Sequence, residues 1–188
     1  MVPTSNFSVP VLGFIAYCSN MGKTTLLKQV ISALNEKSIR VGIVKHCHHE
    51  IQIDKPGKDS YELRKAGAEQ AVLASNNGWA LMVEHQTPEY PKLEYLLERM
   101  DTDNLDIVLL EGFRQEDIPK IEVSRNDVDA PLLCQDSVSG ASIVALVTDR
   151  KEVKDLRDDI VVLPLATPNA VVEFVLDWID LNSLPPMR

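Results

Sequence analysis

Short apolar runs alternate along the chain with segments whose apolar residues recur every three or four positions. The first run, residues 9–17, is rich in β-formers, and residues 22–36 then place Leu27, Ile31 and Leu34 on one helical face. Almost continuously apolar strands that alternate with helices predict an α/β fold, with a mostly parallel sheet covered by helices on both faces. Further strands are expected at 39–44, 71–74, 79–83, 105–110, 118–123, 143–147 and 160–163, and further helices at 59–67, 93–100 and 171–181.

Composition narrows the class of protein. Of the 188 residues, 45% are hydrophobic and 25% are charged, which is typical of a globular chain and excludes a disordered or collagen-like one. We expect a single domain over residues 9–181, an extension at 1–8 and a tail at 182–188. The net charge of −9 argues against a general nucleic-acid binder but leaves room for one local nucleotide site.

The surroundings of the protein can also be inferred. The longest apolar runs are too short to span a bilayer, and the N-terminus lacks the basic segment of a secretory signal. Cys18, Cys47 and Cys134 are odd in number and widely spaced, so no disulfide framework follows. We therefore expect a cytoplasmic protein with no membrane contact.

The most informative segment is residues 17–25, Tyr-Cys-Ser-Asn-Met-Gly-Lys-Thr-Thr, between the first strand and the first helix. In such a loop backbone N–H groups face an anion, Lys23 would reach phosphates and Thr24 would hold Mg²⁺. The Gly-Lys-Thr tail fits the Walker A pattern, but Tyr17 stands where its first glycine belongs. The alternative is an ordinary strand–turn–helix with a solvated lysine. The expected phosphate-binding residues are Ser19, Asn20, Met21, Gly22, Lys23, Thr24 and Thr25.

A carboxylate follows the apolar strand at residues 105–110. Asp106 and Glu111 lie at opposite ends of this strand, about 16 Å apart. Ligands of open parallel sheets bind at the carboxyl ends of strands, so Glu111 can share a site with Lys23 and Asp106 is not expected to. Glu111 is therefore a candidate for holding Mg²⁺ or positioning an attacking water, and the alternative is an exposed loop acid.

Polar residues follow two other strands at the same edge. Lys45 and His46 come after the second strand, and Asp149 comes after the strand at 143–147. The Asp149 carboxylate could accept the N1–H and N2–H₂ donors of guanine, a pair that adenine lacks. Its alternative role is the N-cap of the charged, helix-like stretch 150–159. The convergence of these residues on one sheet edge predicts a nucleotide site there.

Several other residues have both a structural and a functional interpretation. Asp54 and Asp59 flank a Pro-Gly turn, where they could open the turn and cap the next helix, or sense a γ-phosphate or metal. The run at 46–49, His-Cys-His-His, lacks a second ligand pair at zinc-site spacing, so it is interpreted as a polar loop near phosphates. Trp79 and Trp178 are interpreted as core aromatics.

The combination of segments 43–49, 54–68, 79–82, 110–113 and 119–122 resembles the molybdopterin-guanine dinucleotide biosynthesis protein B (MobB) family. The long run Asp-Lys-Pro-Gly-Lys-Asp-Ser-Tyr-Glu-Leu-Arg-Lys-Ala-Gly-Ala is its most specific part. The resemblance implies a P-loop GTPase-like fold, a homodimer, binding of GTP with Mg²⁺ and weak GTP hydrolysis at most. It also implies assistance to a guanylyltransferase (MobA) that joins GMP to molybdopterin.

The resemblance assigns roles to individual residues and also shows one departure. Gly22, Lys23 and Thr24 would bind phosphate and Mg²⁺, Glu111 would be the strand-end acid, and Asp149 the base reader. The family's usual loop is one residue shorter and has one more glycine. Asn20 is the residue here best suited to a left-handed backbone in place of that glycine.

The expected function is a GTP-binding accessory protein of molybdenum-cofactor maturation. One rival is a P-loop kinase for a small hydroxyl substrate, which would need an Arg-rich lid, whereas residues 113–130 contain only Arg114 and Arg125. A second rival is a non-catalytic scaffold that binds a pterin dinucleotide or a partner enzyme. The glycine-poor loop favours this scaffold, which tight GTP binding without turnover would identify.

Overall fold

The computed structural model describes residues 7, 9–47, 54–84, 87 and 90–183. His48 and His49 of the expected polar loop lie outside these residues. The chain divides into two compact units, one comprising Met1–His46 with Leu93–Arg188 and the other Cys47–Lys92. The first is called the sheet unit and the second the hairpin unit.

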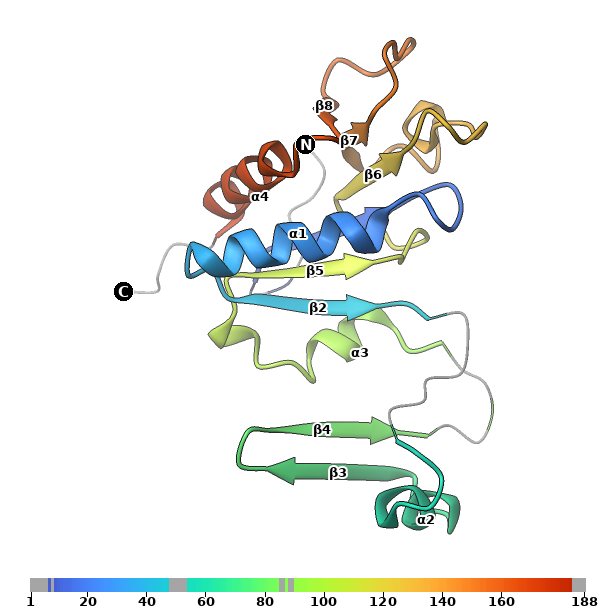
Figure 1. The fold of residues 1–188 in the computed structure, drawn as a ribbon, viewed down its shortest axis with the longest axis vertical. Helices are drawn as coiled ribbons and strands as arrows, with labels where there is room; N and C mark the ends of the chain where they lie inside the picture. The colour runs from blue at the N-terminus through green and yellow to red at the C-terminus, as the bar shows by residue number, and fades with distance from the viewer. Residues whose placement is uncertain (1–6, 8, 48–53, 85–86, 88–89, 184–188) are drawn as a thin grey trace. The chain divides into compact units, whose positions relative to one another are not determined.

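A six-stranded sheet forms the centre of the sheet unit (Figure 1). Every pair of neighbouring strands in it is parallel, as the apolar runs predict. The order β2-β5-β1-β6-β7-β8 places β5 between β1 and β2. The strands are β1 (Val11–Ile15), β2 (Val41–Lys45), β5 (Ile107–Glu111), β6 (Lys120–Ser124), β7 (Ile143–Thr148) and β8 (Val161–Pro164).

Helices cover both faces of this sheet, which confirms the α/β prediction. Leu12 and Phe14 of β1 pack with α1 (Lys23–Glu36) and α4 (Pro168–Asn182) in one core cluster. The intervening Val11 packs in a second cluster with α3 (Leu93–Leu97), because side chains alternate between the faces of a strand. Helix α3 is shorter than the expected 93–100, and two 3₁₀ turns complete the unit, η1 (Thr102–Asn104) and η2 (Leu133–Gln135).

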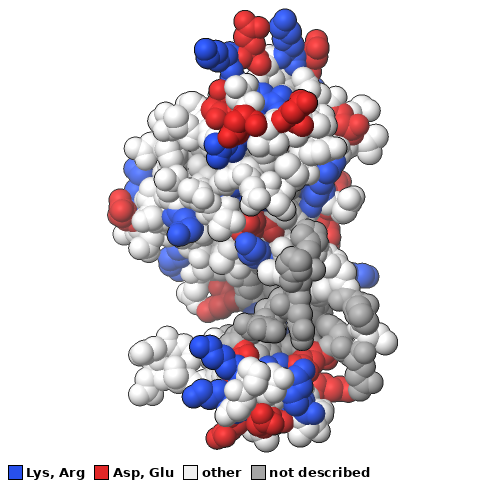
Figure 2. Space-filling view, turned by 45° about the vertical axis from the view of Figure 1, so that its right-hand side comes forward, with Lys and Arg blue, Asp and Glu red and all other residues white. Residues whose placement is uncertain are grey.

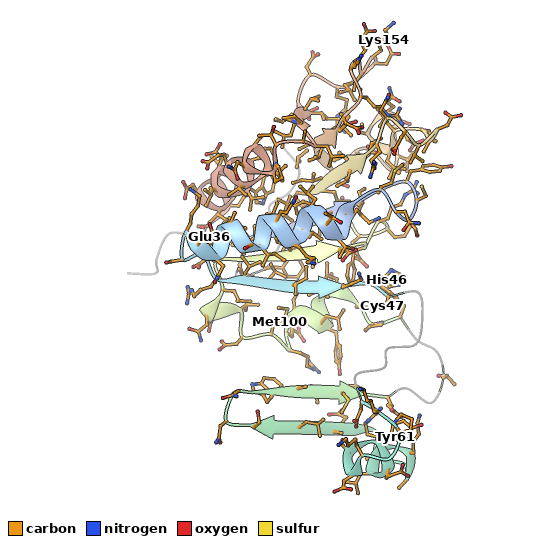
Figure 3. All side chains as sticks on the ribbon, in the orientation of Figure 1. Glu36, His46, Cys47, Tyr61, Met100 and Lys154 are labelled. Atoms are coloured by element: carbon orange, nitrogen blue, oxygen red, sulfur yellow. The ribbon has the colours of Figure 1, made fainter. Side chains whose placement is uncertain are left out.

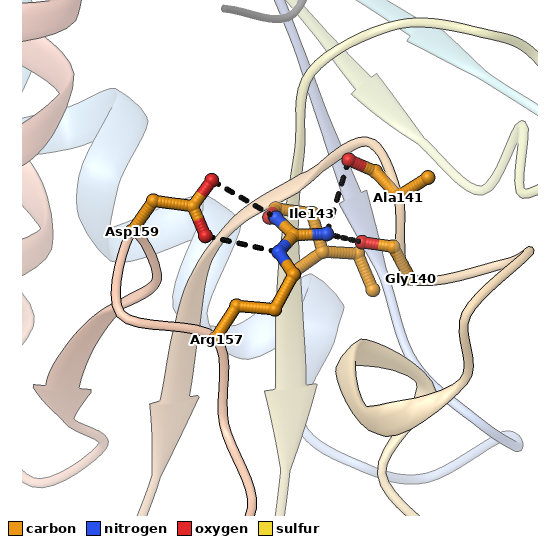
Figure 4. A network of polar contacts seen from close by, with 5 residues as sticks. All are labelled: Gly140, Ala141, Ile143, Arg157 and Asp159. Atoms are coloured by element: carbon orange, nitrogen blue, oxygen red, sulfur yellow. Dashed lines mark hydrogen bonds and ion pairs between the residues drawn. The ribbon is translucent and has the colours of Figure 1, made fainter.

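One arginine ties together two loops at the amino end of β7 (Figure 4). The Arg157 guanidinium donates to the carbonyl oxygens of Gly140 and Ile143 at 2.8 and 2.9 Å, and to Asp159 Oδ1 at 2.9 Å. These bonds link the irregular segment 150–159 to the residues at the start of β7.

The hairpin unit contains α2 (Asp59–Lys65) and the antiparallel strands β3 (Gln70–Ser75) and β4 (Gly78–Val83). The prediction that Asp59 caps its helix is wrong: Lys58 is the N-cap, no side chain caps the helix, and Glu62 Oε1 instead accepts from Gly57 N. The core interpretation of Trp79 is also wrong, since this side chain is 65% exposed on the small hairpin. A two-stranded sheet has no second layer of its own to bury such a residue.

Candidate functional site

The loop between β1 and α1, residues 16–22, turns through two left-handed residues. Asn20 has φ 63° and Gly22 has φ 85°, so Asn20 adopts the conformation expected of it. The Met21 side chain is buried in the core, which leaves only its backbone to face a ligand. Ser19 and Asn20 are exposed. The loop is thus anchored at one point and open on its outer side.

Lys23 and Thr24 open helix α1 directly after Gly22. Lys23 Nζ donates to the carbonyl oxygen of Cys18 at 3.4 Å and so folds back over the loop. Burial lowers the pKa of Lys23, Glu111 and Cys18 oppose this shift, and the Lys45 ammonium adds to it. A cation and a helix N-terminus therefore face the same loop, which is the arrangement that binds anions.

Glu111 meets this loop from the end of β5. Its Oε1 accepts a hydrogen bond from Thr24 Oγ1 at 2.6 Å, and its Oε2 lies 3.0 Å from Lys45 Nζ. The side chain is only 13% exposed. Of the residues that the strand directions predict to converge, Lys23, Lys45 and Glu111 lie together here beside Thr24, and their roles toward a ligand stay predictions.

Asp106 lies at the amino end of the same strand, away from this site. The Arg40 guanidinium donates to it at 2.8 and 3.1 Å, and the Arg40 backbone N–H at 2.7 Å. These hydrogen bonds lower the pKa of Asp106. The two carboxylates at the ends of β5 thus have different partners, as the strand geometry predicts.

His46 supports the backbone that carries Glu111. Figure 3 shows His46 at the carboxyl end of β2. Its backbone N–H donates a hydrogen bond to the backbone oxygen of Glu111 at 2.9 Å. A Cβ at Gly112 would lie 3.1 Å from the His46 Cβ, and Gly112 has φ 95°. The His46 ring also lies 5.9 Å from that of Phe113, between ring centroids. In the described contacts His46 acts as a neighbour that shapes the turn after β5.

Asp149 follows β7 and is exposed. Its Oδ1 accepts a hydrogen bond from Asn126 N at 2.5 Å, which links the loops after β6 and β7. Residues 150–159 form no helix, so the N-cap interpretation of Asp149 is wrong. The carboxylate lies at the carboxyl edge of the sheet, and base reading by it stays a prediction.

Asp54 and Asp59 belong to the hairpin unit. Asp54 Oδ1 accepts from Lys55 N at 2.9 Å, and its Oδ2 is a buried oxygen with no hydrogen-bond partner among the described residues. Asp59 is the first residue of α2 and is exposed. A role for either one toward phosphate or metal stays a prediction.

Sequence reasoning assigned no role to two charged residues of β6 that are fully buried. Glu122 accepts from the backbone N–H groups of Leu133 and Cys134, each at 2.8 Å. Lys120 Nζ donates to Ser142 Oγ at 2.7 Å and to Glu116 O. Their signal in the sequence was a pair of charges that alternate with the apolar Ile121 and Val123 in a strand, and buried charges require partners.

Charged side chains of both signs are mixed on one face of the molecule. On the face seen in Figure 2, the described Lys and Arg side chains are interspersed with Asp and Glu and form no continuous basic patch. None of the helices among the described residues combines the length and apolar character that a membrane crossing requires.

The fold and the site together define a parallel α/β protein in which Lys23 and the N-terminus of α1 meet at a loop on the carboxyl edge of the sheet. The family model of molybdopterin guanine dinucleotide synthesis protein B (MobB) matches residues 11–149, and the chain belongs to this family. The chain is 43% identical over 175 residues to the molybdopterin-guanine dinucleotide biosynthesis adapter protein of Escherichia coli K12, covering 93% of this chain and 96% of that one.

Other relatives agree with this assignment. The adapter protein of the same name from Haemophilus influenzae is 46% identical over 127 residues, which are 68% of this chain and 70% of that one. The crystal structure of Bacillus subtilis MobB superimposes with a TM-score of 0.66 at 22% identity, covering 90% of this chain and 97% of that one. At that identity the structural match supports the fold alone.

Proposed function

We propose that this protein is a GTP-binding adapter in the biosynthesis of molybdopterin guanine dinucleotide. It acts beside a guanylyltransferase that joins GMP to molybdopterin, and it hydrolyses GTP weakly at most. The relatives named as adapter proteins of this pathway support the first part of the proposal. The observation that carries the nucleotide part is the meeting of Lys23, Thr24 and Glu111 at the β1–α1 loop.

The residues of the site fit Mg²⁺. Thr24 Oγ1 and Glu111 Oε1 lie 2.6 Å apart and could both serve as metal ligands. Mg²⁺ prefers a few protein oxygens together with phosphate oxygens and water. Thr24 and Glu111 would hold the ion, which would neutralise phosphate charge when bound. Lys23 and the loop N–H groups would bind the phosphates themselves. Glu111, which hydrogen-bonds Thr24, is also the residue that could position an attacking water, and the turnover is proposed to be slow.

Guanine selectivity is assigned to Asp149. Its Oδ1 is engaged by Asn126 N, and its exposed carboxylate keeps further acceptor capacity for two donors of a base. Replacement by Asn exchanges one acceptor for a donor. The Asp149→Asn variant should therefore lose GTP preference and gain affinity for xanthosine triphosphate, whose base carries a carbonyl where guanine carries its amino group.

The test is a calorimetric titration of the wild type with GTP and with ATP, each with Mg²⁺, beside Lys23→Ala. We expect selective GTP binding that falls at least about tenfold in Lys23→Ala, because a charge-assisted contact to phosphate is lost. Lys28→Ala, an exposed lysine further along α1, is the matched control and should bind as the wild type does. Equal binding of ATP, or unchanged binding in Lys23→Ala, would contradict the proposal.

An exposed apolar face of the hairpin unit favours the adapter role and a homodimer. Cross-strand pairing puts Val72, Ala74, Trp79 and Leu81 on one face of the β3–β4 hairpin. Val72 and Trp79 are 63% and 65% exposed in the single chain. Apolar faces of this kind are typical of association surfaces, and a second copy of the chain would cover it.

All three cysteines are free, which supports the assignment to a reducing compartment such as the cytoplasm.

A non-catalytic scaffold is the second candidate function. The observation that favours it is Asn20 in the left-handed position where glycine would let the backbone approach phosphate more closely. A guanylyl-transfer assay with the partner enzyme separates the two. Stimulation of transfer that survives in Lys23→Ala identifies the scaffold, whereas stimulation lost with GTP binding identifies the nucleotide-dependent adapter.

A further inference from the structure

We propose that Lys45 is a positioning residue that occupies the Glu111 carboxylate while no divalent cation is bound, and that it must leave before a cation can take that carboxylate. The inference rests on the proposed function, since it deepens the role of the same site. It predicts that the free protein binds a divalent cation poorly on its own.

The pairing of β2 with β5 fixes Lys45 opposite Glu111. The two residues are partners in the parallel register, and paired residues on neighbouring strands project from the same face of a sheet. The backbone bond from His46 N to Glu111 O continues the ladder beyond this pair, so the register is held on both sides. The register therefore keeps the two side chains within reach of each other, and Lys45 Nζ lies 3.0 Å from Glu111 Oε2.

Both oxygens of Glu111 are already engaged. Thr24 Oγ1 donates to Oε1 and the Lys45 ammonium lies against Oε2, so a cation that binds this carboxylate competes with the ammonium for its negative charge. A divalent cation bound to this carboxylate would also place its two positive charges beside the Lys45 ammonium. Lys45 is 48% exposed and has a flexible stem, so it can move aside once another anion attracts it.

The charge around the loop indicates which kind of anion would draw Lys45 away from Glu111. Lys23 and Lys45 supply two positive charges against the single negative charge of Glu111, so these three side chains leave one positive charge in excess. The Lys45 charge is close enough to Lys23 to lower its pKa. A polyphosphate would relieve this excess and draw the ammonium from Glu111, so phosphate and metal should bind together and a metal alone should not.

The test measures Mn²⁺ binding to the nucleotide-free full chain by electron paramagnetic resonance. The variants are Lys45→Met, which keeps the stem and removes the charge, and Lys45→Arg, which keeps the charge. Repulsion between an ammonium and a divalent ion about 6 Å apart in watery surroundings changes affinity about tenfold. We expect Lys45→Met to bind Mn²⁺ about tenfold tighter than the wild type, and Lys45→Arg to match the wild type.

Two controls locate the ion. The acidic surface binds Mn²⁺ non-specifically, and the double variant Lys45→Met with Glu111→Gln measures that background, so the gain must vanish in it. Lys45→Gln is a second uncharged variant in case Lys45→Met does not fold, as judged by circular dichroism. If both uncharged variants bind Mn²⁺ as the wild type does, or if the gain survives Glu111→Gln, the proposal is overturned.

The outcome is independent of the GTP titration. A gain in Mn²⁺ affinity with no GTP binding would support the role of Lys45 and contradict the proposed function. GTP binding with no gain in Mn²⁺ affinity would do the reverse. A merely structural role for Lys45 would lower stability in Lys45→Met without raising metal affinity, which the same samples would reveal in a thermal melt.

Discussion

Glu122 offers a sharp test of how the fold is held beside the site. Its fully buried carboxylate is bound through both oxygens by the N–H groups of Leu133 and Cys134, at the start of η2. These N–H groups begin a short helix and have no carbonyl acceptor within it. Replacement by Gln keeps the shape of the side chain but turns an NH₂ group toward one of them.

The magnitude follows from these two bonds. A hydrogen bond to a charged acceptor contributes about 1.5–3 kcal/mol, and a buried N–H left without an acceptor costs about 1–3 kcal/mol. Part of the loss is recovered, because the neutral amide is easier to bury than a carboxylate. We therefore expect Glu122→Gln to lower the free energy of unfolding by about 3 kcal/mol, which is a large share of the stability of a typical domain.

The assay is urea unfolding followed by the fluorescence of Trp178 in a Trp79→Phe background. That background leaves one tryptophan, which packs beside Phe174 in the sheet unit. With a slope of about 2–3 kcal/mol per molar urea, the midpoint should fall by about 1 M. The control is Glu173→Gln, whose side chain is 66% exposed in a pair with Lys37 at 3.7 Å and should change stability by less than about 0.5 kcal/mol.

A midpoint for Glu122→Gln equal to that of the control would refute this reasoning. It would mean that the N–H groups of η2 find other acceptors, or that the loop detaches before the sheet unit unfolds. The second case is distinguishable, because amide exchange at Leu133 and Cys134 would then be fast in the wild type.

Two further predictions concern a thiol and the hairpin. Burial and the neighbouring Glu122 raise the pKa of Cys134 from 9.0 to about 12, so Ellman's reagent should label two thiols in the native chain and three in urea. The unfolded thiol ionises first, so the free energy of unfolding should fall by about 1.4 kcal/mol per pH unit above pH 9 relative to Cys134→Ala, and equal slopes would contradict this. Trp79→Ser should weaken the proposed dimer at least about tenfold in sedimentation, whereas Leu181→Ser, equally apolar and exposed on α4, should not; equal effects would exclude the hairpin face.

Much of the sheet unit could be predicted from the sequence, because buried parallel strands need uninterrupted apolar runs. The irregular segment 150–159 could not, because its charged residues have acceptable helix propensity and tertiary contacts override it. Arg157 bonds to backbone oxygens of Gly140 and Ile143, and Asp155 takes φ 55°, which no helix accommodates. Trp79 was misplaced for a related reason: apolar character does not reveal whether a second layer exists to bury it.

The site shows where strand order adds what local sequence lacks. That Lys23 and Glu111 share a sheet edge follows from the direction of parallel strands alone. That Lys45 lies on the same carboxylate does not, because it requires β5 to lie between β1 and β2. Only in that order does one strand-end acid receive Thr24 from the helix that follows β1 and Lys45 from the end of β2. A carboxylate in this central position contacts both partners, so under the proposal a phosphate that attracted the lysine would also leave the acid to a cation.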